Sequence, residues 1–190
     1  YSSCKKYVYD QWSSPVKSYL YDNGDGTLTR VEYADSKIIH EIFDSKYQLV
    51  SSASISPELA LFGGFFHGAE ANYVVVGQNN PDQSDSREVV RVIKYSFDWQ
   101  KLGSCSLYGA NTYIPFDAGS LRFAESGDYL MIRTCHTMYG TDVHHQANLS
   151  MEVNTASMTV LDSFSKVWNI ANGYVSHSFN QFIQTDGNLM

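Results

Sequence analysis

Polar side chains that can bind a ligand gather in the second half of the chain. The stretch PFDAGSLR holds a carboxylate and a guanidinium group, and the stretches RTCHTMY, HHQAN and SHSFNQF hold imidazoles and amides. Together these groups supply both donors and acceptors, the combination that orients a sugar, a peptide or a small anion. Tyr113 and Tyr139 can add flat faces for a sugar ring. The predicted ligand-binding residues are Asp117, Arg122, His136, His145, Gln146, Asn148, His177 and Asn180.

Two of these histidines are also candidate catalytic residues. An unperturbed imidazole titrates at about pH 6.5, so His136 or His177 could act as a general base in hydrolysis, elimination or group transfer. The sequence has no G-x-S-x-G elbow, no S-x-x-K motif and no cysteine–histidine signature for a nucleophile. We therefore expect a binding protein and keep the enzyme as the alternative.

The segment YDNGDGTLTRVE nearly matches a calcium-binding EF-hand loop. Its first ligand position holds Tyr21, and strand-like sequences replace the flanking helices of an EF-hand. Asn-Gly and Asp-Gly between alternating apolar runs favour a β-hairpin, because these residues tolerate a positive φ. A hairpin turn is the prediction, and a calcium site at Asp22, Asn23 and Asp25 is the alternative. The histidines, including His67, match no compact metal motif, so no other metal is expected.

These candidates must be positioned by β-strands. Residues 27–33, 73–78, 89–95 and 129–134 are rich in Val, Ile, Tyr and Thr, and each run stops at Gly, Asn, Asp or Ser. No segment combines a helix cap with a 3.6-residue apolar stripe. The acidic segment 79–88, NNPDQSDSRE, reads as a solvent-exposed loop rather than a cation site. The sequence therefore predicts an all-β protein.

The strands recur in one order along the chain. In each unit a tight polar turn joins the first two strands, and a four-residue turn ending in a bulky residue joins the last two. The bulky residues are Tyr47, Trp99 and Met158, which are 52 and 59 residues apart. A period near 50 with four antiparallel strands is typical of propeller blades. We predict a propeller-like array of about three and a half blades within one domain at 14–190. The blades span 15–56, 59–108 and 116–165, with a partial blade at 176–190. The alternative is a β-sandwich.

Composition limits the remaining possibilities. The 190 residues are 43% hydrophobic and 17% charged with a net charge of −7, which excludes a disordered tail and a basic surface for nucleic acid. No apolar run is long enough to cross a bilayer.

Three cysteines cannot form a full disulfide framework, and we expect separate buried thiols, with one bridge plus a free thiol as the alternative. Residues 1–13 read as a leader or linker, and a chain starting at Tyr1 without Met suggests removal of a signal peptide or an expression leader.

The sequence ends at Met190 within a predicted strand. An unfinished sheet edge tends to associate. We therefore expect the chain either to be part of a longer propeller or to complete a ring with a second copy, and favour the longer propeller.

The segments LYGANTYIPFDAGSLR, RTCHTMY, HHQAN and GYVSHSFNQFI resemble uncharacterised secreted or cell-surface proteins of Gram-positive gut-type bacteria. The resemblance spans about 14–190 and implies a β-propeller fold, export, a surface location and further blades. It does not name a ligand, and no cofactor follows from it.

These observations predict an extracellular binding or scaffold module. Its ligand, a glycan, a peptide or a surface partner, would bind at the propeller mouth, among polar residues of the innermost strands and the loops before them. A structural array that assembles with copies of itself is a further alternative. Neither nucleic acid nor a membrane is an expected partner.

Overall fold

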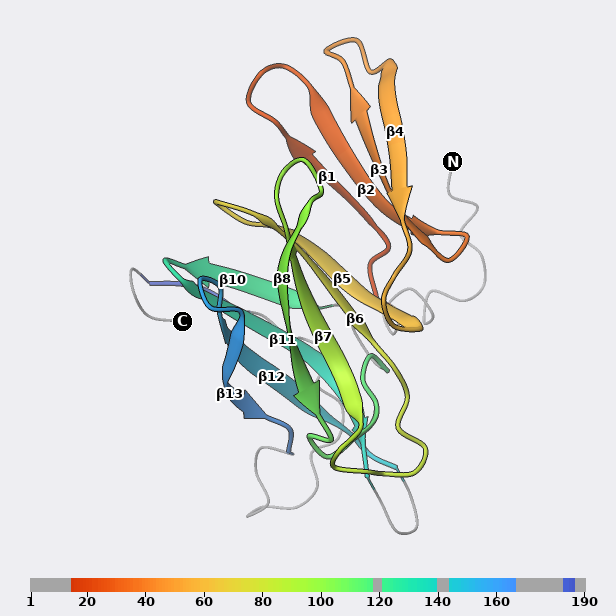
Figure 1. The fold of residues 1–190 in the computed structure, drawn as a ribbon, viewed down its shortest axis with the longest axis vertical. Coiled ribbons are helices and arrows are strands. Elements are labelled where there is room, and N and C mark those ends of the chain that lie inside the picture. Colours follow the sequence, from red (N-terminus) through yellow and green to blue (C-terminus); the bar gives the residue numbers. More distant parts are fainter. Residues whose placement is uncertain (1–14, 118–120, 140–143, 167–182, 187–190) are drawn as a thin grey trace.

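The computed structural model describes residues 15–117, 121–139, 144–166 and 183–186, and these segments form an all-β protein (Figure 1). The strands build three antiparallel sheets, each with four strands in chain order, and the third sheet has a short fifth strand beside them. None of the described segments is helical, so none forms a helix that could cross a membrane. The predicted all-β class and antiparallel four-stranded sheets are confirmed.

Each sheet is a simple meander. The first sheet contains β1 (Ser18–Asp22), β2 (Leu28–Ala34), β3 (Lys37–Phe43) and β4 (Leu49–Ile55). The second sheet contains β5 (Leu61–His67), β6 (Asn72–Gly77), β7 (Glu88–Tyr95) and β8 (Lys101–Tyr108). The third sheet contains β10 (Arg122–Ser126), β11 (Tyr129–Met138), β12 (Gln146–Asn154) and β13 (Thr159–Phe164), and the short β9 (Thr112–Ile114) pairs with β11.

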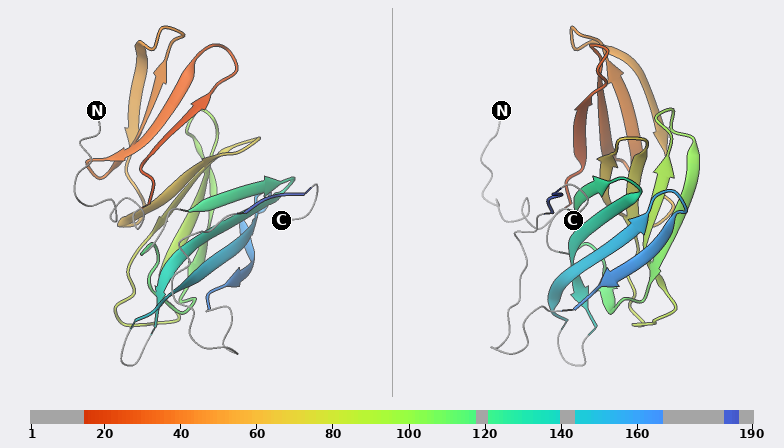
Figure 2. Two further views of the ribbon diagram at one scale, coloured as in Figure 1. Left: turned by 180° about the vertical axis from the view of Figure 1, so that it is seen from behind. Right: turned by 90° about the vertical axis from the view of Figure 1, so that its left-hand side faces the viewer.

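The second sheet lies between the other two, and each of its faces belongs to a separate apolar core (Figure 2). Val74 and Val76 of β6 pack in the core with the first sheet, while Tyr73 and Val75 pack in the core with the third sheet. This double burial explains why β6 reads as a continuous apolar run rather than an alternating one. Each buried valine contributes about 1.5 kcal/mol or more through removal of apolar surface from water.

The third strand of every sheet carries a bulge just before its final turn. The register shifts between Ile42 and Phe43, between Lys94 and Tyr95, and between Glu152 and Val153. The bulky residue that ends each turn has left-handed backbone geometry, with φ of 61° at Tyr47, 61° at Trp99 and 51° at Met158. The sequence repeat therefore corresponds to a repeated piece of backbone geometry.

The sheets do not close into a ring within the described residues, so the propeller-like array and the β-sandwich both stay predictions. The four predicted strand segments lie within β2, β6, β7 and β11 apart from single end residues. Cys105 and Cys135 are both buried, as expected for these two thiols. Cys4, residues 1–13 and most of the segment 176–190 lie outside the described residues.

Candidate binding sites

Asp117 lies in a hollow of about 450 Å³ at one end of the third sheet. Its Oδ2 atom accepts hydrogen bonds from Thr137 Oγ1 and from Gln146 Nε2, the latter at 3.1 Å. The rings of Tyr113 and His144 stack nearby, with centroids 3.9 Å apart and planes 4° from parallel. The hollow thus combines a carboxylate with a flat aromatic pair. Its lining residues are Tyr113, Ile114, Asp117, Thr137, His144, His145 and Gln146.

Phe116 fixes the backbone that carries Asp117. Its side chain is buried between the second and third sheets, against two glycines of the second sheet. A Cβ atom on Gly63 would lie 2.6 Å from Phe116 Cζ, and one on Gly77 would lie 2.8 Å from Phe116 Cε2. Only glycine leaves room for the ring at these positions. Gly63 of the run FGGFFHG and Gly77 therefore serve as a platform for Phe116, a role that the sequence did not reveal.

The loop between β6 and β7 also supports this hollow. Asn80 is fully buried and donates from Nδ2 to Tyr139 Oη at 2.7 Å and to the Ser84 carbonyl at 2.9 Å. Its backbone N–H donates to the carbonyl of Tyr113 at 2.8 Å. The expectation of a wholly solvent-exposed loop at 79–88 is wrong at Asn80, because this residue packs against residues far along the chain.

The structure brings together only part of the predicted site. Asp117, His145 and Gln146 line one hollow, with Tyr113 beside them. Arg122 on β10 lies opposite Arg133 of β11, Asn148 on β12 lies opposite Cys135, and neither lines the hollow. His177 and Asn180 lie outside the described residues.

His136 is fully buried in β11. Its Nδ1 atom is 2.8 Å from Thr112 Oγ1. Burial lowers the pKa of His136 to about 4, and a hydrogen bond with the Ser165 backbone opposes this shift. The imidazole is therefore neutral at neutral pH and does not reach the hollow. A catalytic role for His136 therefore stays a prediction, and its burial separates the ring from the Asp117 hollow.

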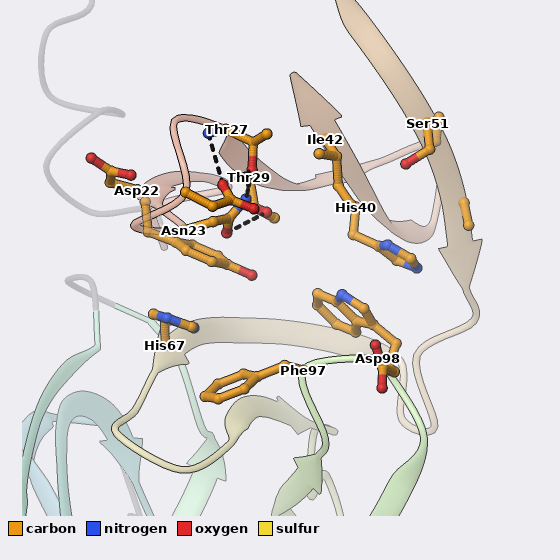
Figure 3. Close-up of a pocket in the computed structure, with 15 residues that line it drawn as sticks. Asp22, Asn23, Thr27, Thr29, His40, Ile42, Ser51, His67, Phe97 and Asp98 are labelled. Atoms are coloured by element: carbon orange, nitrogen blue, oxygen red, sulfur yellow. Dashed lines mark hydrogen bonds between the residues drawn. The ribbon is translucent and has the colours of Figure 1, made fainter. Parts of the chain in front are cut away.

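A second and larger hollow, of about 600 Å³, lies between the first and second sheets, beside the turn that joins β1 to β2 and the turn that joins β7 to β8 (Figure 3). One wall is the stacked pair Tyr21–His67, with centroids 3.8 Å apart. The other is the stacked pair His40–Trp99, with centroids 4.5 Å apart. We call this hollow the aromatic cleft. Its lining residues are Tyr21, Asp22, Asn23, Asp25, Thr27, Thr29, His40, Ile42, Ser51, Ser52, Ala53, His67, Phe97, Asp98 and Trp99.

The predicted hairpin turn between β1 and β2 forms the rim of the aromatic cleft and is confirmed. Asp22 Oδ1 accepts from the Gly24 N–H at 2.8 Å, and Asp25 Oδ1 accepts from the Thr27 N–H at 2.9 Å. Asn23 Oδ1 accepts from Thr29 Oγ1 at 2.9 Å. One side-chain oxygen of each of these three residues thus accepts a hydrogen bond at the turn, and calcium binding there stays a prediction. Among the described residues, no three His, Cys, Asp or Glu side chains gather to hold a metal ion.

Sequence reasoning did not identify the aromatic cleft. Its residues come from the turns of two successive units, which are far apart in the chain. The sequence did contain a signal. The first strands of the first two units both carry aromatic residues, Tyr19 and Tyr21 in one and Phe65 and Phe66 before His67 in the other, and the second unit adds the turn with Asp98 and Trp99.

Comparison with known proteins adds no assignment to either hollow, because no protein-family model matches the chain and no curated protein matches it. Function must therefore be argued from the two hollows.

Proposed function

We propose that this protein is a glycan-binding module of a secreted or cell-surface protein and that Asp117 is its central ligand-binding residue. The observation that carries the proposal is the Asp117 carboxylate, oriented by Thr137 and Gln146 beside the stacked rings of Tyr113 and His144. A carboxylate accepts hydrogen bonds from sugar hydroxyls, and an aromatic plane packs against the apolar face of a sugar ring. The hollow of about 450 Å³ falls within the usual range for small-ligand sites.

A propeller-like architecture is part of this proposal. Three sheets, each with a four-stranded meander, stack in chain order and repeat the same bulge and left-handed turn residue. Loops between successive blades and between the second and third strands of a blade share one end of such an array. Asp117 precedes the first strand of its sheet, and His145 and Gln146 border the start of the third strand, so the hollow occupies this end. The location outside the cell rests on the resemblance and on the composition.

The test is a glycan array followed by calorimetry on the hits. Replacement Asp117→Asn removes the charged acceptor, and we expect it to weaken binding about tenfold or more. Asp162→Asn is the matched control, because Asp162 is an exposed aspartate on β13 away from the hollow. Binding that survives Asp117→Asn unchanged would refute this site.

The enzyme alternative is tested with the same hits. Incubating each bound glycan with the protein and analysing the products by mass spectrometry would detect cleavage or group transfer. Because His136 is buried with its pKa lowered to about 4, we expect no turnover that depends on His136. Light scattering on the same sample tests assembly into dimers or larger arrays.

A further inference from the structure

We propose that the aromatic cleft binds an organic cation, that is, a ligand whose bound part is an alkylammonium group. This site is separate from the Asp117 hollow, and its lining residues belong only to the first and second sheets. The proposal therefore does not depend on the glycan site.

Aromatic rings line both sides of the aromatic cleft, and a cation is attracted to the parts of their faces that their stacking partners leave open. Tyr21 and His67 form one wall, and His67 also meets Phe97 at 5.1 Å between centroids. His40 and Trp99 form the opposite wall. Phe97 is 49% exposed, so part of its ring is open to a ligand. A cation within about 6 Å of such rings is held by their negative faces, and recognition of ammonium ligands by aromatic cages uses this attraction.

The charges of the aromatic cleft favour the same ligand. Three aspartates, Asp22, Asp25 and Asp98, line it, and its lining residues include no Lys or Arg. Hydrogen bonds from the side chain and backbone of Thr27 lower the pKa of Asp25, which keeps this carboxylate ionised. Figure 3 shows Asp22 on the hairpin side of the gap and Asp98 on the opposite side. An anion would meet three carboxylates and no fixed positive charge, so an anionic ligand is disfavoured.

His40 adds a pH dependence to the aromatic cleft. Burial lowers the pKa of His40, so its imidazole stays neutral at neutral pH and does not repel a cation. His67 Nδ1 lies 2.8 Å from Asn72 Oδ1 and its ring stacks on Tyr21. The titratable groups facing the aromatic cleft are Asp22, Asp25 and Asp98 from the turns, His40 from β3, His67 from β5, and Tyr21 from β1. Protonation of His40 in acid would add a positive charge to one wall of the aromatic cleft, so cation binding must weaken as the pH falls.

The volume of about 600 Å³ and the open rim suit either a small quaternary amine or a lysine side chain on a peptide. The two sources share one chemistry and can be separated by probe. Choline represents the free amine, and a lysine-containing pentapeptide blocked at both ends represents the peptide. The matched neutral probes are 3,3-dimethyl-1-butanol for choline and the norleucine peptide for the lysine peptide.

The experiment is NMR titration of the full chain at pH 7.5, following the ring signals of Tyr21, His67 and Trp99. We expect at least one cationic probe to bind at least about fivefold more tightly than its neutral partner. Asp98→Asn and Phe97→Ala should each weaken binding by about threefold or more. Higher salt and a shift to pH 5 should weaken it further.

Two variants control for general effects of charge and surface aromatics. Asp35→Asn makes the same charge change in the turn between β2 and β3, and Tyr108→Ala removes an exposed aromatic ring at the end of β8. Both should bind the probe as the parent does. The proposal would be overturned if the neutral probes bound as tightly as the cations, or if an anion such as acetate bound more tightly than they do. It would also be overturned if neither cation bound at any concentration tested. Asp117→Asn should leave cation binding unchanged, which separates this site from the glycan site.

Discussion

The indole ring of Trp99 in the second sheet stacks on the imidazole of His40 in the first sheet, with their planes 12° from parallel. Trp99 holds this position with a φ of 61°, a left-handed conformation that side-chain-bearing residues rarely adopt. Tyr47 has the same φ in the corresponding turn of the first sheet, yet its side chain is 75% exposed. The turn geometry is therefore independent of the contact between sheets, and of these two residues only Trp99 uses its bulky side chain for packing.

This difference predicts that glycine at the two positions changes the stability of the protein by different amounts. Replacement of Tyr47 by Gly removes the left-handed strain, of about 1 kcal/mol, and loses little buried surface. Replacement of Trp99 by Gly removes the same strain but also the contacts with His40, Phe65 and Tyr95. We expect Tyr47→Gly to change the free energy of unfolding by less than about 1 kcal/mol, and Trp99→Gly to lower it by about 2–4 kcal/mol. Urea unfolding followed by tyrosine fluorescence measures both, and equal losses would contradict the assignment of Trp99 to the contact between sheets.

The glycine platform under Phe116 predicts that one methyl group disturbs the Asp117 hollow. Gly63→Ala would place a Cβ atom 2.6 Å from Phe116 Cζ, and the buried ring has no room to retreat. We expect a loss of about 1–3 kcal/mol in the free energy of unfolding and shifted NMR signals at Tyr113 and His144.

Gly103→Ala is the control for that prediction. Its new Cβ atom would lie 3.0 Å from Cγ of Met158, a flexible side chain that can move aside. The free energy of unfolding should change by less than about 1 kcal/mol, and the signals of Tyr113 and His144 should stay in place. Similar effects of the two substitutions would show that Phe116 does not position Asp117.

Local patterns of the sequence were sufficient to predict strands and turns. Alternation and turn residues identified the strands, and Asp-Gly and Asn-Gly identified the hairpin after β1. The repeat of Tyr47, Trp99 and Met158 corresponds to one recurring turn conformation. These features depend on neighbouring residues, which is why they can be inferred without the fold.

Convergence of side chains was harder to predict, because it depends on how the sheets face one another. Asp117 and Gln146 are 29 residues apart and meet only through the pairing of β11 with β12. Asn80 is buried and donates a hydrogen bond to Tyr139, which is 59 residues away. His136 lies in the alternation of Leu130 and Ile132, which pack in the core with the second sheet, so the strand pattern did contain a signal for its burial.

The two described thiols should be unreactive in the native protein. Cys105 and Cys135 are buried, and burial raises the pKa of Cys105 to about 11, so little thiolate is present at pH 8. In a Cys4→Ser variant, Ellman's reagent should label neither thiol in buffer and both in 6 M guanidinium chloride. Rapid labelling of either thiol in buffer would contradict the buried placement.

His136 predicts a loss of stability in mild acid. In the unfolded chain its pKa is near the ordinary 6.5, whereas burial lowers the folded value to about 4, so the unfolded state binds the proton first. Stability should therefore fall as the pH drops from about 6.5 to about 4, by roughly 3 kcal/mol in total from this group, and the contribution should level off below that range.

His136→Asn should flatten the pH profile over this window, despite a lower starting stability. Thr112→Val removes the partner of Nδ1 but keeps the imidazole, so its profile should stay steep. Glu58 and Glu88, whose pKa values are lowered by Lys101 and Arg91 among other contacts, lose their contribution at lower pH in all variants alike. Parallel profiles for His136→Asn and the parent would mean that His136 takes up its proton in the folded state as readily as in the unfolded chain.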